Sequence, residues 1–246
     1  MPKSTTPTLK SAHIITATKI SYGQPSLINE ASFNISSSGV SAIMGPNGAG
    51  KSLLLRLIAK LIKPTSGTLE FLKSAQKSNP EIAIVFQKPV LLRRSVRANL
   101  EHALNAVNGN DKDKTQIKNQ IDELLRQAQL SEIADRPARV LSGGEQQRLA
   151  LVRALASNPK ILLLDEATAS LDPSATALIE KIIKDTAKND TKIIMITHDF
   201  GQAKRLSNDI IFMAKGKVLE QQKTSDFFKK PITKQAKAYL DGKLVV

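Results

Sequence analysis

The sequence predicts an α/β protein whose core is a largely parallel β-sheet. Short aliphatic runs such as KILLLD (160–165) and KIIMIT (192–197) recur along the chain, and helical patterns stand between them. Strands of a parallel sheet are buried on both faces, so they read as continuous apolar runs, and helices connect them. A mostly helical block, residues 88–157, separates two such strands. It predicts an inserted helical subdomain.

The N-terminal third is predicted to be mostly β structure. Residues 13–21 and 28–36 alternate apolar and polar side chains, as strands with one solvated face do. Residues 40–44 form a short apolar strand that runs into a Gly-rich loop and then a helical pattern. Further strands are predicted at 67–72 and 82–86.

The rest of the chain continues the alternation. Within the helical block, residues 115–130 place these apolar residues on one helix face: Ile117, Ile121, Leu124, Leu125 and Ala128. The polar stretch NAVNGNDKDKTQ, residues 105–116, is predicted to be a surface loop. Helices are expected from Ser174 and from Asp199, with final strands at 209–214 and 216–221.

Composition narrows the function classes. The 246 residues carry a net charge of +14 and no cysteine, which excludes disulfides, thiolate metal sites and cysteine nucleophiles. No apolar run approaches 18 residues and the N-terminus has no signal-type apolar segment, so we expect neither a membrane span nor secretion. The positive charge favours anionic partners, or it is simply a basic bias of a soluble surface. With 4% aromatic residues and no Trp, a base-stacking platform for nucleic acid is not expected.

GPNGAGKS, residues 45–52, matches the phosphate-loop pattern G-x-x-x-x-G-K-[S/T] between a strand and a helix. Such a loop turns successive backbone N–H groups toward a phosphate, while its Lys and Ser reach the outer phosphates and Mg²⁺. A Gly-rich turn that matches by chance is the alternative, and the strand–helix context disfavours it. The predicted nucleotide-binding residues are Gly45, Pro46, Asn47, Gly48, Ala49, Gly50, Lys51 and Ser52.

A second motif ends the aliphatic run ILLLDE with two acids. Asp165 and Glu166 follow a buried strand, so they emerge at the carboxyl edge of the sheet, where ligands bind. We predict that Asp165, with Ser52, serves Mg²⁺ and that Glu166 polarises the attacking water. An acidic turn at a strand end is the alternative.

LSGGEQQR, residues 141–148, connects these motifs to a family. Ser142, Gly143 and Gly144 offer a hydroxyl and accessible N–H groups at a predicted helix start, which makes a second anion site. Together with the two motifs above, the stretch resembles the nucleotide-binding subunits of ABC transporters. In that family the motif contacts ATP held by the other subunit. Glu145 stands where the family more often has Gln, and we expect an active site despite it.

The resemblance covers nearly all of residues 10–230 and implies the fold. The implied fold is that of a P-loop NTPase of the ABC type, with a RecA-like parallel sheet core, an antiparallel β subdomain and an inserted α-helical subdomain. The expected organisation is a single nucleotide-binding domain over 1–246, with an ATP-binding core at about 10–87 and 158–223, a helical subdomain at about 88–157 and a short C-terminal helical tail at 224–246.

The resemblance also assigns single residues. It implies that Tyr22 stacks on adenine, and that Gln87 reaches Mg²⁺ and the attacking water. It further implies that Asp172, in ASLD, lies at the dimer interface near nucleotide, and that His198 contacts the γ-phosphate. A strand-edge tyrosine and a structural histidine are the alternatives for Tyr22 and His198.

The implied cofactors are ATP and Mg²⁺, and the implied assembly is a head-to-tail homodimer enclosing two ATP molecules. Two separate permease subunits and, indirectly, an extracytoplasmic substrate-binding protein complete the expected importer, with this chain at the cytoplasmic face of the inner membrane and no nucleic-acid partner. Because the tail is short, we expect no substrate-sensing by a C-terminal regulatory domain of about 100 residues.

QKPVLLRRSVRANL, residues 87–100, resembles the tungstate-type oxyanion importers, although phosphate-type ATPases also have QKP. We therefore expect uptake of tungstate or a related oxyanion. An importer ATPase for phosphate, molybdate or an amino acid, or a soluble non-transport ABC ATPase, remains open. Residues 90–94 are expected to line the groove for a permease helix, with Leu91 and Leu92 giving apolar contact and Arg93 and Arg94 charge matching. A solvated basic loop is the alternative.

Overall fold

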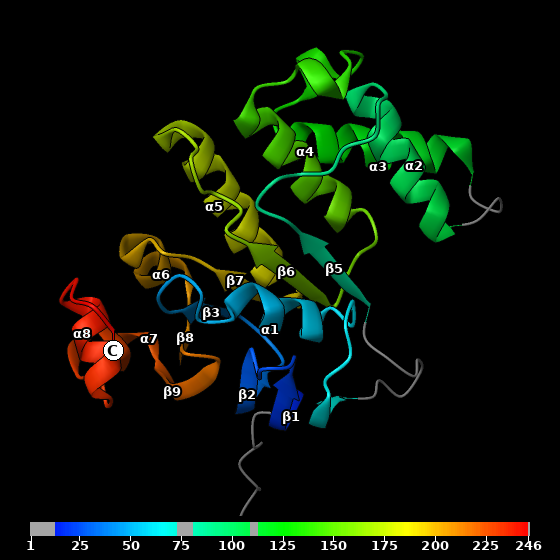
Figure 1. The fold of residues 1–246 in the computed structure, drawn as a ribbon. Helices are drawn as coiled ribbons and strands as arrows, with labels where there is room; N and C mark the ends of the chain where they lie inside the picture. The colour runs from blue at the N-terminus through cyan, green and yellow to red at the C-terminus, as the bar shows by residue number, and fades with distance from the viewer. Residues whose placement is uncertain (1–12, 73–80, 109–112, 246) are drawn as a thin grey trace, which may run out of the picture.

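The structure, a computed structural model, describes residues 13–72, 81–108 and 113–245. The α/β prediction is confirmed: helices cover both faces of a six-stranded sheet within these residues (Figure 1). Its strands, in spatial order, are β5 (Ile82–Val85), β6 (Ile161–Asp165), β7 (Lys192–Ile196), β3 (Val40–Met44), β8 (Asp209–Ala214) and β9 (Lys217–Lys223). All neighbours pair in parallel except β8 and β9.

The central strands are largely apolar because each face of the sheet meets a different core. In β6, Leu162 and Leu164 belong to one hydrophobic cluster, whereas Ile161 and Leu163 belong to the other. Successive side chains of a strand point to opposite faces, so a strand covered on both sides has no polar position left. The continuous ILLL run is the direct result.

A smaller antiparallel sheet packs on one of these cores. It has the order β2 (Ile28–Ser36), β1 (His13–Tyr22) and β4 (Ser66–Phe71). Helix α1 (Lys51–Ile58) lies between the two sheets and buries Leu54, Leu55, Leu57 and Ile58 in the same cluster as the inward residues of β1 and β2. This sandwiched position fixes the first turn of α1 at the edge of the main sheet.

The remaining helices pack on the other core. The upper lobe of Figure 1 contains α2 (Val96–Asn108), α3 (Lys114–Gln127) and α4 (Gly143–Leu155). Helix α5 (Pro173–Lys188) lies between this lobe and the sheet in the view. At the left of the view are α6 (Phe200–Leu206), α7 (Thr224–Lys229) and α8 (Lys234–Leu240). The loop predicted for 105–116 is shorter than expected. Its Asn-Ala-Val start continues α2 through Asn108, and α3 begins at Lys114; residues 109–112 lie outside the described part.

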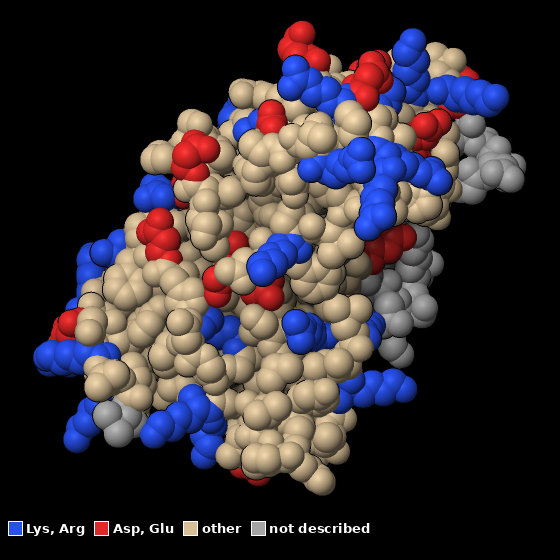
Figure 2. Space-filling view, turned by 45° about the horizontal axis from the view of Figure 1, so that its top comes forward, with Lys and Arg blue, Asp and Glu red and all other residues tan. Residues whose placement is uncertain are grey.

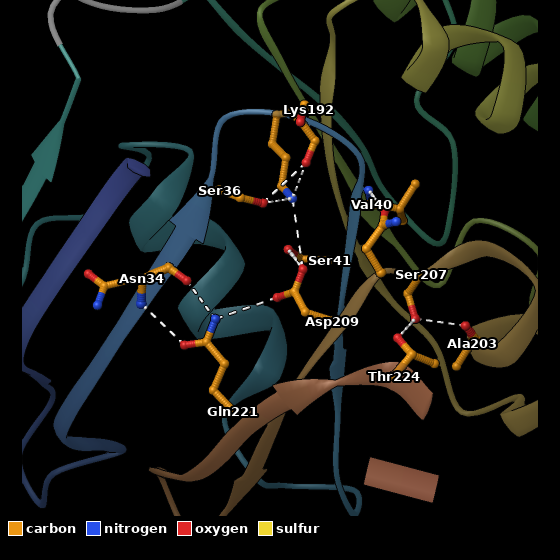
Figure 3. A network of polar contacts seen from close by, with 12 residues as sticks. Asn34, Ser36, Val40, Ser41, Lys192, Ala203, Ser207, Asp209, Gln221 and Thr224 are labelled. Atoms are coloured by element: carbon orange, nitrogen blue, oxygen red, sulfur yellow. Dashed lines mark hydrogen bonds and ion pairs between the residues drawn. The ribbon is translucent and has the colours of Figure 1, made fainter. Parts of the chain in front are cut away.

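A polar network joins the antiparallel sheet to the main sheet at the edge where β7 begins (Figure 3). The Lys192 ammonium is fully buried and donates to Ser36 Oγ at 3.0 Å and to the Ser38 carbonyl at 2.9 Å. Asp209 lies 4.0 Å from the same ammonium. Nearby, Gln221 of β9 exchanges two hydrogen bonds with the backbone of Asn34 in β2. These contacts fix β2 relative to the strands that carry the site.

Among the helices that the structure describes, none combines the length and the apolar character needed to cross a membrane. On the face in Figure 2, Lys and Arg side chains are scattered over the surface, and Asp and Glu side chains lie among them near the top, at the left and near the middle of the view. The surface is therefore mixed in charge despite its net excess of basic residues.

Candidate functional site

Four chain segments meet at the carboxyl edge of the main sheet. Gly45 follows β3, Gln87 lies two residues beyond β5, Glu166 follows β6, and His198 lies two residues beyond β7. Because these strands are parallel neighbours, their carboxyl ends open at the same edge, which is where ligands bind in such sheets.

The phosphate loop runs from Gly45 into α1. Its last glycine, Gly50, is the N-cap of α1 and has a left-handed backbone with φ of 94°. The Lys51 ammonium is buried and donates to the carbonyls of Gly45 at 3.0 Å and Pro46 at 2.9 Å. Burial lowers its pKa, and the carboxylates of Glu166 and Asp165 offset part of that shift. A buried cation at a helix N-terminus is suited to a phosphate group.

The Ser52 hydroxyl donates to Asp165 Oδ1 at 3.1 Å. Burial raises the pKa of the Asp165 carboxyl; the Ser52 hydrogen bond opposes this shift and the charge of Glu166 adds to it. The Ser52 hydroxyl and the Asp165 carboxylate therefore place two oxygen atoms side by side, and oxygen is the ligand type that Mg²⁺ prefers.

A magnesium ion at this point would need further oxygen ligands. In the part of the chain that the structure describes, no group of three or more His, Cys, Asp and Glu side chains is arranged to hold a metal ion. Mg²⁺ is typically bound by one or two protein oxygens together with substrate phosphates and water. The donor set thus fits an ion that arrives with a nucleotide and neutralises charge on its phosphates.

Glu166 is held between two polar side chains. His198 Nε2 lies 3.0 Å from Glu166 Oε1, and Gln87 Nε2 donates to Glu166 Oε2 at 3.1 Å. The Glu166 backbone is left-handed, with φ of 49°. This conformation is strained for a residue other than glycine, and residues with such strain cluster at functional sites. The three side chains that the sequence predicted as catalytic therefore come from three different strands to one point.

The LSGG segment lies elsewhere. It begins α4, which Figure 1 draws in the helical lobe, whereas α1 and the phosphate loop lie in the layer below. Ser142 caps α4 by accepting from Glu145 N, and the Glu145 carboxylate accepts from both the N–H and the hydroxyl of Ser142. Apart from its chain neighbours and its own helix, no group in the described part of the chain lies within 4 Å of where a Cβ on Gly143 would stand. The backbone at this helix start is open to a second molecule.

Asp172 and Tyr22 are placed at the edges of this arrangement. Asp172 caps α5, with Oδ1 accepting from the N–H groups of Ser174 and Ala175. Sequence reasoning missed this capping role, although Asp followed by Pro is a usual helix start. Tyr22 ends β1 and is partly buried; the turn after it reaches the phosphate loop, since the Leu27 carbonyl oxygen lies 3.2 Å from a Cβ built on Gly50.

Helix α4 also holds the segment that follows Gln87. Gln147 Nε2 donates to the Phe86 carbonyl at 3.2 Å, and Arg153 donates to the Val90 carbonyl at 2.6 Å. The fully buried Asn99 accepts from the Leu92 N–H and donates to the Leu92 carbonyl. These three polar side chains could not be identified as supports from the sequence, because their partners are set only by the packing of the helical lobe.

Residues 90–94 lie at the surface to different degrees. Leu91 and Leu92 are partly buried, and Leu91 packs against the protein's own core, whereas Val90 is 72% exposed. Arg93 and Arg94 are exposed. The expected groove for a permease helix stays a prediction, with Val90 as the most exposed apolar side chain of the segment.

A further buried network supports the chain after Glu166. Gln202 Nε2 donates to Thr168 Oγ1 at 2.9 Å and to Glu180 Oε1 at 3.3 Å. Arg205 forms an ion pair with the same buried carboxylate at 2.6 Å. These contacts tie α5 and α6 to the segment between Glu166 and Asp172.

At one edge of the sheet lie a phosphate loop, the oxygen pair of Ser52 and Asp165, and a glutamate in contact with His198 and Gln87. This arrangement defines a P-loop nucleotide hydrolase. A family profile described as ABC transporter matches residues 28–169. The chain belongs to the ABC transporter family, and it is an ATPase.

Relatives and solved structures agree with this assignment. The tungstate uptake system ATP-binding protein TupC of Peptoclostridium acidaminophilum is 41% identical over 204 residues, which cover 82% of this chain and 94% of TupC. The phosphate import ATP-binding protein PstB 2 of Bacillus licheniformis is 35% identical over 241 residues, or 91% of this chain and 86% of PstB 2.

Among solved structures, cbiO1 from Clostridium perfringens, part of the cbiONQ complex, has a TM-score of 0.77 at 29% identity and covers 89% of this chain and 91% of its own. A dimeric post-hydrolysis structure of the ATP-binding cassette MJ0796 with ADP and Pi has a TM-score of 0.76 at 28% identity, covering 85% and 98%.

Proposed function

We propose that this ATPase powers an importer for tungstate or a related oxyanion, as two copies of the chain beneath two separate permease subunits at the cytoplasmic face of the membrane. An extracytoplasmic binding protein delivers the oxyanion. The similarity to TupC over 94% of that protein supports the substrate class. The relatives named for phosphate and methionine import support import in general.

The observation that carries the catalytic part is the geometry of Glu166. Its carboxylate stands 3.0 Å from His198 and 3.1 Å from Gln87, beside the phosphate loop. In the proposed mechanism Glu166 orients the attacking water, His198 contacts the γ-phosphate, and Lys51 binds the outer phosphates. Ser52 and Asp165 hold Mg²⁺, with Gln87 within reach of it, and Tyr22 stacks on adenine.

Each chain supplies one half of the proposed site. Ser142 and Gly143 are exposed at the start of α4, and among the described residues beyond its own helix and chain neighbours nothing lies within 4 Å of a Cβ built on Gly143, so this helix start suits a phosphate. We propose that Ser142, Gly143, Gly144 and Glu145 close over the ATP of the partner copy, with Asp172 at the same interface. Dimer closure then gates hydrolysis.

The substrate is tested in proteoliposomes that contain the ATPase, its permease and the binding protein. Tungstate-loaded binding protein should stimulate ATP hydrolysis several-fold, and Glu166→Gln in the same complex should abolish the stimulation. If binding protein loaded with phosphate, molybdate or an amino acid stimulates hydrolysis and tungstate does not, that compound replaces tungstate as the proposed substrate. If the chain co-purifies with no permease and binds nucleic acid in a salt-sensitive way, the result would favour a soluble non-transport ABC ATPase.

A further inference from the structure

A buried glutamine connects three segments next to the site. Gln202, in the first turn of α6, is 2% exposed. Its Nε2 donates to Thr168 Oγ1 at 2.9 Å and to Glu180 Oε1 at 3.3 Å. A primary amide carries two N–H donors, and each of them has an acceptor here. The side chain therefore joins α6 to helix α5 and to the turn that follows β6.

On one side, Gln202 holds the turn that follows Glu166. This turn is strained, since Glu166 and Ser170 both have left-handed backbones, with φ of 49° and 63°. Ser170 is exposed, whereas Thr168 is partly buried and accepts the hydrogen bond from α6. The Thr168 hydroxyl thus anchors the strained turn to a helix of the same chain. The turn runs on to Asp172, the residue proposed above for the dimer interface.

On the other side, Gln202 belongs to the helix that begins just after His198. The Asp199 side chain caps α6 by accepting from the Gln202 N–H at 2.9 Å. The Asp199 N–H in turn donates to Thr197 Oγ1 at 3.1 Å, so the two residues that flank His198 are joined by a hydrogen bond. The backbone and the amide of Gln202 thus link the segment of His198 to the turn of Glu166.

The second acceptor of Gln202 is itself firmly held. Arg205 donates to Glu180 Oε2 through Nε at 3.1 Å and to Oε1 through Nη2 at 2.6 Å, which makes a bidentate ion pair. Glu180 is buried, and an ionised carboxylate only accepts hydrogen bonds, so it fixes which end of the amide faces it. Gln202 cannot rotate its Nε2 away from Thr168 without leaving a buried donor unpaired.

We propose that Gln202 is a positioning residue for ATP hydrolysis: its amide holds the turn of Glu166 and the segment of His198 in a fixed relative position, so that these two side chains stay 3.0 Å apart. Gln202 is too deeply buried to touch a bound nucleotide, and it acts through the other two residues. The inference rests on the roles proposed above for Glu166 and His198.

Steady-state ATPase kinetics of the purified chain test this role. Gln202→Leu removes both donors and keeps a side chain of similar size, so kcat should fall by about tenfold, as loss of one buried hydrogen bond implies. KM for ATP should stay within about twofold, because the phosphate loop between β3 and α1 lies outside these contacts. A purely structural residue would lower the melting temperature and leave kcat of the folded enzyme unchanged.

Thr168 provides the matching change from the opposite side. Thr168→Val removes the acceptor and keeps the shape, so kcat should fall similarly, whereas the conservative Thr168→Ser keeps the hydroxyl and should restore kcat to within about twofold of the wild type. In the double variant of Gln202→Leu with Thr168→Val, the losses should not multiply, because both changes break the same hydrogen bond. A combined loss of about 100-fold would show two independent effects and would overturn the inference.

Gln222→Leu is the matched control. Gln222 also donates to a buried carboxylate, that of Glu220 at 3.4 Å, but it lies on the edge strand β9. Its kcat should match the wild type. If Gln202→Leu and Thr168→Val both fold and keep kcat within about twofold, or if Gln222→Leu loses as much activity, the inference is overturned.

Glu166→Gln is measured alongside to separate this inference from the proposed function. Loss of turnover in Glu166→Gln, with Gln202→Leu at the wild-type rate, would refute the positioning role alone. Wild-type turnover in Glu166→Gln would refute the role proposed for Glu166, on which the positioning role depends.

Discussion

The buried ammonium of Lys192 makes the stability of the protein depend on pH in a predictable direction. Burial lowers its pKa from 10.5 to about 8, with Asp209 opposing the shift. Between these two values the unfolded chain keeps a proton that the folded protein has released, so the free energy of unfolding rises with pH. A shift of this size corresponds to about 3 kcal/mol, of which about 2.5 kcal/mol is gained between pH 7 and pH 10.

The assay is urea unfolding of the wild type and Lys192→Met at both pH values. Methionine removes the titrating group and keeps an unbranched stem of similar length, so the other titrations cancel in the comparison. The stability difference, wild type minus variant, should move in favour of the wild type by about 2.5 kcal/mol on going from pH 7 to pH 10. Lys188→Met changes an ammonium whose side chain is 75% exposed and should show no such trend.

A pH-independent difference between wild type and Lys192→Met would refute this reasoning. It would mean that the ammonium is solvated in the folded protein, and that the network of Figure 3 does not isolate it from water.

Two further predictions concern the segment after Gln87. Asn99→Ala leaves the Leu92 N–H and carbonyl without their partner in a buried setting, so the free energy of unfolding should fall by about 2–4 kcal/mol in urea titrations. Asn119→Ala is the exposed control, and an equal loss in it would contradict this reasoning. Arg93→Glu should abolish coupled transport in proteoliposomes while the isolated subunit keeps its basal ATP hydrolysis, and the exposed control Lys118→Glu should change neither; loss of basal hydrolysis in Arg93→Glu would mean that the segment is structural.

Much of the fold follows from local patterns in the sequence. The run ILLLD predicts a doubly covered strand because both of its faces must be apolar, and β6 has this burial at all five positions. GPNGAGKS predicts a strand–loop–helix unit because only a loop rich in glycine can turn its N–H groups toward a phosphate. These patterns are readable because each is contained within a few consecutive residues.

The supports of the site were not predictable in the same way. Lys192 contacts Ser36 across 156 positions of sequence, and Gln147 contacts Phe86 across 61. Nothing near Tyr239 in the sequence indicates that its ring packs on Phe200 and Phe212, since these become its neighbours only when α6 and β8 are in place. Such contacts depend on tertiary packing, which no local periodicity records. The roles of the site residues and the boundaries of the subdomains remain predictions.

The most direct test of the account is ATP turnover by purified Glu166→Gln compared with the wild type and with Glu101→Gln, an exposed control on α2. Glutamine keeps the size of the side chain and removes its basicity. If Glu166 orients and activates the attacking water, turnover should fall by about 100-fold or more while ATP binding persists, and Glu101→Gln should match the wild type. Turnover of Glu166→Gln near the wild-type rate would contradict the central claim.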